Sequence, residues 1–161
     1  MNRRKVTLLT VSIGLTLLFF SGSAFAAEKL CIVADEAGLN LAKDLITSLN
    51  NESIPLSIFM DHVEDVKNAK YVIVLGGAKA ADDINGFIKQ VLTTQELEAG
   101  KQPGGKVFVK ENVFTKGQTI IVFTGPDEAS AAAARKNSRK TWWPYIAKWF
   151  DLDSSGDPMP Y

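Results

Sequence analysis

The fold of this chain is centred on the segment Tyr71-Val-Ile-Val-Leu-Gly-Gly77. A strand with one face in water alternates apolar and polar residues. This short segment is instead apolar without interruption up to its two glycines, which is typical of a central strand buried on both faces. The rest of the chain can be arranged around this strand, either as further strands or as helices that cover them.

Three segments before this strand have clear patterns. The apolar run Leu30–Ala34 predicts a first strand. The apolar residues of 37–49 recur with the spacing i, i+3, i+4, i+7, which predicts an amphipathic helix. The segment Ile54–Phe59 predicts a second strand, with Pro55 near its start, where a missing N–H group disturbs a sheet least. Residues 61–70 are polar and predict a short turn or helix.

The segments after the central strand predict a second helix and a hairpin. Residues 80–97 repeat the helical period, and residues 98–105 form a loop rich in glycine. Two strand-like runs follow, Lys106–Phe114 and Thr119–Thr124. The short connection between them contains Gly117, so the two runs predict an antiparallel hairpin. The second run is apolar enough to lie beside the central strand.

The C-terminal third predicts helices. Pro126, Asp127 and Glu128 suit the first turn of a helix, where free N–H groups and the helix dipole favour acids. An alanine-rich stretch continues this helix. We expect Pro144 to interrupt it, because a proline pushes the preceding residue out of helical geometry. A last short helix then carries Ile146, Trp149 and Phe150.

The order of these elements indicates the fold class. Strand–helix–strand units come first and the hairpin comes late. This order predicts a three-layer α/β sandwich, with a mixed, mainly parallel sheet of about five strands and helices on both faces. We expect one domain over residues 27–150 and a flexible tail over residues 151–161.

The N-terminus has the pattern of a secretory signal peptide over residues 1–26. Arg3, Arg4 and Lys5 precede an apolar run, and Ala24-Phe-Ala26 matches the small-residue motif that signal peptidases cleave, here before Ala27. The alternative is an uncleaved membrane anchor, but the apolar run is shorter than the ~20 residues that span a bilayer. We therefore expect an extracytoplasmic protein, periplasmic or secreted.

Charge and cysteine content narrow the function further. The whole chain has 18 basic and 18 acidic residues. Removal of the signal peptide takes away three basic residues and no acidic one, so the formal net charge becomes −3. This balance argues against nucleic acid as a partner. Cys31 is the sole cysteine, has apolar neighbours and cannot form an internal disulfide, so we expect a buried thiol.

One candidate ligand site lies where the predicted parallel strands end. Ligands of open α/β sheets bind beyond the carboxyl ends of the strands. The candidate residues there are Asp35, Gly76, Gly77, Gly125 and Asp127. The two glycines match neither a P-loop nor a dinucleotide-binding fingerprint. We therefore favour the interpretation that they form only a tight strand-to-helix turn, rather than a ligand cradle.

We expect no catalytic residue, no metal site and no cofactor. His62 is the single histidine, and no cluster of cysteine and histidine supports a metal. The Gly-x-Ser-x-Gly motif of a serine nucleophile does not occur in the sequence. Acidic pairs such as Asp82-Asp83 suit the first turn of a helix without any catalytic role.

A second candidate site is the basic and aromatic segment 135–150. Its candidate surface residues are Arg139, Lys140, Trp142, Trp143 and Trp149. Such a segment can lie at a membrane interface, stack on sugars or contact an anionic polymer of the cell envelope. We favour the other interpretation, in which the tryptophans cover the core beside the alanine-rich helix, which fills little volume.

The order of features also resembles the α/β domain of S-layer-type cell-surface proteins. The matching segments cover roughly half of the chain after residue 26: Tyr71–Gly77, Lys106–Phe114, Ile120–Gly125 and Ala129–Arg135. The resemblance implies a non-catalytic extracytoplasmic module, whose partners would be an envelope protein, a glycan or a membrane surface. Two alternatives remain: a periplasmic ligand-binding protein or enzyme that uses the strand-end acids, and a membrane- or glycan-associating protein that uses the tryptophans.

Overall fold

The computed structural model describes residues 28–152. The predicted signal peptide and residues 153–161 of the predicted tail lie outside this range. The described chain forms one five-stranded sheet in the order β2-β1-β3-β5-β4. Its strands are β1 (Leu30–Ala34), β2 (Leu56–Phe59), β3 (Tyr71–Gly77), β4 (Lys106–Glu111) and β5 (Thr119–Gly125). All neighbouring strands are parallel except β4 and β5, which are antiparallel.

The prediction of a central strand at Tyr71–Gly77 is confirmed. Strand β3 lies between β1 and β5, and all seven of its residues are buried. Its side chains alternate between two cores: Ile73 and Leu75 belong to one, and Val72 and Val74 belong to the other. The strand is apolar throughout because both faces of the sheet are covered.

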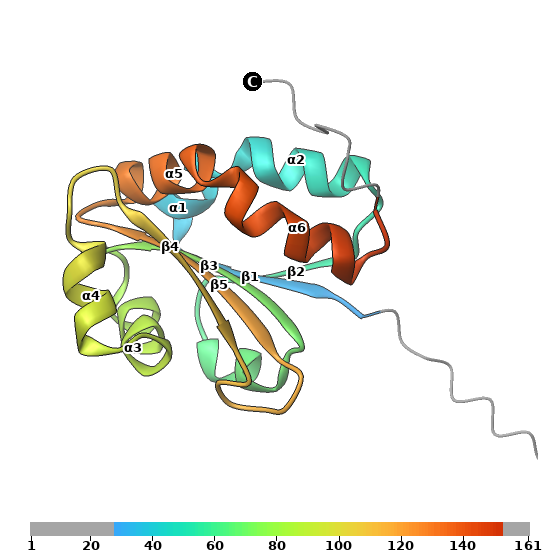
Figure 1. The fold of residues 1–161 in the computed structure, drawn as a ribbon, viewed down its shortest axis with the longest axis horizontal. Coiled ribbons are helices and arrows are strands. Elements are labelled where there is room, and N and C mark those ends of the chain that lie inside the picture. The colour runs from blue at the N-terminus through green and yellow to red at the C-terminus, as the bar shows by residue number, and fades with distance from the viewer. Residues whose placement is uncertain (1–27, 153–161) are drawn as a thin grey trace, which may run out of the picture.

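The helices form a layer on each side of the sheet (Figure 1). We call one side the α5–α6 face; it carries α1 (Glu36–Leu41), α2 (Lys43–Asn51), α5 (Glu128–Asn137) and α6 (Arg139–Trp149). The other side is the α3–α4 face; it carries the 3₁₀ helix η1 (Val63–Asn68), α3 (Asp82–Val91) and α4 (Thr94–Gly100). The expected three-layer α/β sandwich with a mixed sheet and a late hairpin is therefore correct.

Two predicted helices are each divided in two. The predicted helix 37–49 breaks at Ala42, whose N–H donates to the carbonyl of Leu39, three residues back, so the chain tightens there. The predicted helix 80–97 breaks at Leu92, which is extended. Thr93 and Glu96 form a capping box that starts α4. The capping box therefore starts a new helix inside a segment whose hydrophobic period predicted one continuous helix.

The predicted interruption at Pro144 is wrong. Helix α6 passes through Pro144, and the break between α5 and α6 falls at Ser138. A proline within a helix removes one hydrogen bond to the preceding turn. Here Trp142 and Trp143, just before the proline, are both buried, and Ile146 after it is buried as well. Packing of these side chains against the sheet holds the helix together across the missing bond.

Candidate functional site

The Gly76-Gly77 end of β3 is packed tightly on both sides. A Cβ atom at Gly77 would lie 2.6 Å from the Cα of Asp127, at the start of α5. A Cβ at Gly76 would lie 3.0 Å from Cδ1 of Ile88, on α3. Close packing therefore explains why glycine occupies both positions: the missing side chains let helices approach the strand from opposite faces.

The two strand-end carboxylates both bind helix N-termini. Oδ1 of Asp35 accepts a hydrogen bond from the N–H of Gly38 at 2.8 Å, and its Oδ2 accepts one from Ala81 at 3.3 Å. Asp127 accepts from the N–H of Ser130 at 2.7 Å. Hydrogen bonds from Ser130 hold the pKa of Asp127 below its usual range. Each carboxylate is thus a capping group that is already used in the fold.

The candidate ligand residues do not line one common pocket. A crevice beneath α1 and α5, lined by Gly38, Leu75, Gly76 and Arg135 among others, encloses about 10 Å³. This volume suits one water molecule at most. The structure brings Gly77 into direct contact with Asp127 and pairs it with Gly125 across β3 and β5, while Gly125 also lines a different cavity.

Arg135 closes that crevice and was not predicted to do so. Its side chain is 1% exposed, and Nη2 donates to Oδ1 of Asp44 at 2.7 Å and to the carbonyl of Leu41 at 3.2 Å. Burial alone raises the pKa of Asp44, but the hydrogen bond and charge of Arg135 outweigh this and lower it. In the sequence, Arg135 is one of several basic residues, and nothing distinguishes the buried Arg135 and Arg139 from the exposed ones.

A larger cleft lies on the α3–α4 face, beside the carboxyl ends of β3 and β5. Its volume is about 430 Å³, within the range of small-molecule sites. Buried Ile88 and half-buried Leu97 give it an apolar lining. The remaining lining residues come from both helices and the strand ends: Ala78, Asn85, Lys89, Thr94, Glu98, Gly100, Lys101, Thr124 and Gly125. We call this cavity the α3–α4 cleft.

Some polar side chains of the cleft already have partners within the protein, and others are free to contact a ligand. Nζ of Lys101 pairs with Oε1 of Glu98 at 2.6 Å. Nδ2 of Asn85 donates to the carbonyl of Ala80 at 2.7 Å. Lys89 has no ion-pair partner among residues 28–152. The amino group of Lys89 is therefore the cation best able to meet an anionic group in the cleft.

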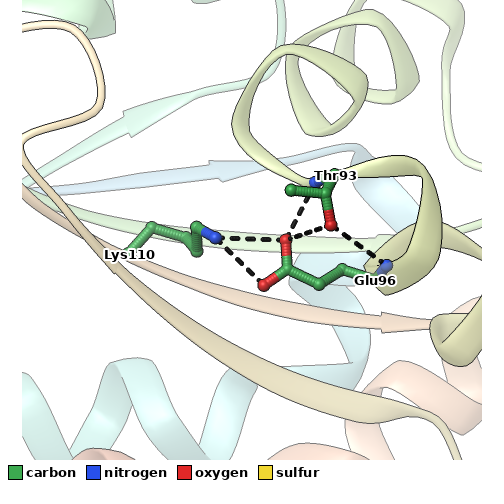
Figure 2. Close-up of polar contacts among 3 residues, drawn as sticks. All are labelled: Thr93, Glu96 and Lys110. Atoms are coloured by element: carbon green, nitrogen blue, oxygen red, sulfur yellow. Dashed lines mark hydrogen bonds and ion pairs between the residues drawn. The ribbon is translucent and has the colours of Figure 1, made fainter.

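Helix α4, one wall of the cleft, is held in place by Glu96 (Figure 2). Its carboxylate accepts from the N–H of Thr93 at 2.8 Å and from Nζ of Lys110, on β4, at 3.0 and 3.1 Å. The backbone bond from Thr93 is the largest cause of the lowered pKa of Glu96, followed, among the lowering contributions, by the bond from Lys110. One carboxylate thus caps the helix and ties it to the sheet.

The other end of α4 rests directly on β5. A Cβ atom at Gly100 would lie 2.7 Å from Cγ2 of Thr124. The wall of the α3–α4 cleft is therefore fixed at both ends before any ligand binds. The Thr93-x-x-Glu96 capping box was the signal in the sequence that divides the helix and creates this wall.

The candidate surface residues are mostly part of the core. Trp142 is 1% exposed, and its Nε1 donates to the carbonyl of Arg135 at 2.8 Å. Trp143 is also buried, and Trp149 is half-buried and stacked on Tyr71 with 4.6 Å between ring centroids. The guanidinium of Arg139 lies over the ring of Trp143. Of the five candidates, Lys140 is the one that is exposed.

A hollow of about 330 Å³ is lined by His62, Glu64, Asp82 and Asp83 among others. Within residues 28–152, no three His, Cys, Asp or Glu side chains are grouped so as to hold a metal ion.

Among residues 28–152, no helix is both long enough and apolar enough to cross a membrane. Cys31 is buried, and burial raises the pKa of its thiol.

No protein-family model matches the chain, and no curated protein matches it. The candidate function therefore depends on the residues and the geometry described above.

Proposed function

We propose that this protein is an exported, non-catalytic binding module of the cell envelope. Its binding site is the α3–α4 cleft, and its ligand has a mainly apolar body and one negatively charged group. The volume and apolar lining of the cleft are the observation that carries this proposal. Ile88 and Leu97 would contact the apolar body, and Lys89 would meet the charge.

The strand-end geometry supports a non-catalytic role. A general acid or base must have a proton position that substrate can reach. Asp35 and Asp127 instead accept hydrogen bonds from helix N-termini, and Gly77 is covered by Asp127. For Asp35 or Asp127 to act in catalysis, its carboxylate would have to break the hydrogen bonds that cap the helix. The burial of Trp142 and Trp143 likewise removes the rings that membrane or glycan association would require.

Export is supported by the signal-peptide pattern of residues 1–26. We expect protein expressed with its full N-terminus in a bacterial host to leave the cytoplasm and to begin at Ala27, as measured by intact mass and N-terminal sequencing. Replacing Ala26 by arginine should leave the segment attached, because signal peptidase requires a small residue there. The control Ala27→Ser should still be processed. Unprocessed wild-type protein in the membrane fraction would instead indicate an anchor.

Blocking the cleft should weaken ligand binding. We expect the purified protein to bind anilinonaphthalene sulfonate, which has an aromatic body and one negative charge, as measured by fluorescence titration. Thr94→Trp places a large ring at the cleft and should weaken binding at least about tenfold, or ~1.4 kcal/mol. Gln95→Trp is the matched control: it is exposed on the same helix but is not part of the lining, so binding should be unchanged.

The charge of the ligand is tested separately. Lys89→Gln should weaken binding of the sulfonate by only about threefold, since an exposed ion pair contributes ~0.2–1 kcal/mol. Equal loss in Thr94→Trp and Gln95→Trp, or binding that neither change affects, would show that the probe binds elsewhere and would overturn the proposed site.

A further inference from the structure

Strand β2 forms one edge of the sheet and pairs only with β1. The N–H of Leu30 donates to the carbonyl of Pro55 at 2.9 Å, which sets the direction of the β2 backbone groups. Because these groups alternate along a strand, residues 55, 57 and 59 point their backbone groups toward β1, and residues 56 and 58 point theirs away. No residue of the range 28–152 pairs with those outward groups.

The same stretch carries exposed apolar side chains. Ile58 and Met60 are each 47% exposed. Leu56 packs partly against the core of the α5–α6 face, and strand alternation places Ile58 on that face as well. The open edge therefore presents hydrogen-bonding groups and apolar side chains at the same residues, which is the combination that favours pairing with another strand.

The opposite edge of the sheet is protected, and β2 is not. Strand β4 contains Lys106, Lys110 and Glu111, and charged side chains of this kind discourage strand pairing. Residues 56–60 contain no charge. Pro55 does not protect β2 either, because its backbone faces β1, so the N–H group that it lacks is missing on the paired side.

The edge is self-complementary. In an antiparallel pair centred on Ile58, the outward groups of Ile58 meet those of Ile58 from a second copy, and Leu56 lies opposite Met60. Leu56, Ile58 and Met60 share one face and are all apolar, and on the other face Ser57 lies opposite Phe59. The nearest charged residue, Asp61, lies opposite Pro55, so no like charges meet. A dimer with a two-fold axis uses the same surface on both copies, so that surface must be complementary to itself.

We propose that β2 pairs antiparallel with β2 of a second copy, joining the two sheets into one continuous ten-stranded sheet. A standard stable interface buries about 1,600 Å², and a pairing over five residues buries less. The dimer therefore forms at high protein concentration and dissociates on dilution. No residue of β2 lines the α3–α4 cleft, so this interface does not depend on the proposed ligand.

Sedimentation of the purified protein over an about hundredfold range of concentration tests this dimer. We expect wild-type protein to shift from monomer to dimer as concentration rises. Ile58→Lys and Ile58→Glu should each remain monomeric, because two like charges would face each other across the axis. An equal mixture of the two variants should recover the dimer, because opposite charges then meet. Circular dichroism confirms that each variant is folded.

The matched control is Leu41→Lys. Leu41 is 43% exposed, close to the value for Ile58, but it lies on α1 and not on the sheet edge, so this variant should dimerise like wild type. Wild-type protein that stays monomeric at every concentration overturns the proposal. So does a dimer that survives Ile58→Lys, and so does a mixture of the two charged variants that fails to associate.

Discussion

Replacing Gly77 by alanine is expected to destabilise the protein by at least about 3 kcal/mol, which corresponds to a fall in Tm of more than about 10 °C. The added Cβ would lie 2.6 Å from the Cα of Asp127, so it meets backbone and not the end of a flexible side chain. Either β3 or the start of α5 must move. Because Asp127 caps α5, this movement also disturbs the helix.

Gly86→Ala is the matched control for this prediction. Gly86 lies within α3, and no atom lies within 4 Å of the position that its Cβ would occupy. Alanine there should stabilise the helix by about 0.5–1 kcal/mol. Thermal unfolding followed by circular dichroism measures both variants. If Gly77→Ala unfolds at the wild-type temperature, the contact with Asp127 does not restrain the end of β3, and a ligand cradle there becomes the better explanation.

Replacing Trp142 by alanine is expected to cost about 3–5 kcal/mol of folding free energy. The ring is 1% exposed and packs edge-to-face on Phe123, with 5.3 Å between centroids. Its Nε1 also donates to the carbonyl of Arg135 near the end of α5. Truncation therefore leaves a cavity between α6 and the sheet and removes the bond that joins the two consecutive helices.

Urea unfolding followed by circular dichroism measures this loss without depending on tryptophan emission. Trp149→Ala serves as the comparison, because Trp149 is only half-buried and should cost less. The wild-type emission spectrum should be shifted to short wavelength, as expected for buried rings. A Trp142→Ala variant of unchanged stability that fails to bind envelope glycan or lipid vesicles would contradict this assignment and would favour a surface role.

The fold was predicted from two kinds of local pattern. Continuous apolar runs located β1, β3 and β5, and helical periods located the segments that cover them. The hairpin was recognised because Gly117 lies in a short connection between two strand-like runs. These patterns are properties of neighbouring residues, so one sequence is enough to recognise them. The division of helices at Ala42 and Leu92 was missed because periodicity continues across both breaks.

The candidate site was predicted less well. Asp35, Gly77 and Asp127 were placed correctly at the ends of strands and the starts of helices. Asp35 and Asp127 each cap a helix through an N–H group three residues further along the chain. The close contact of Gly77 with Asp127, in contrast, follows from how α5 lies on the sheet. The α3–α4 cleft has lining residues from 78 to 125, and Gly125 is the only candidate ligand residue among them. No local pattern connects such distant positions.

The sequence by itself determined the layered fold, the central strand and the capping chemistry, because each depends on residues within a few positions of one another. The tertiary structure decided which members of similar groups are buried. Arg135 is buried while Lys140 is exposed, and Trp142 and Trp143 are buried while Trp149 is only half-buried. Burial depends on which distant segments pack together, and that packing is a property of the whole folded chain.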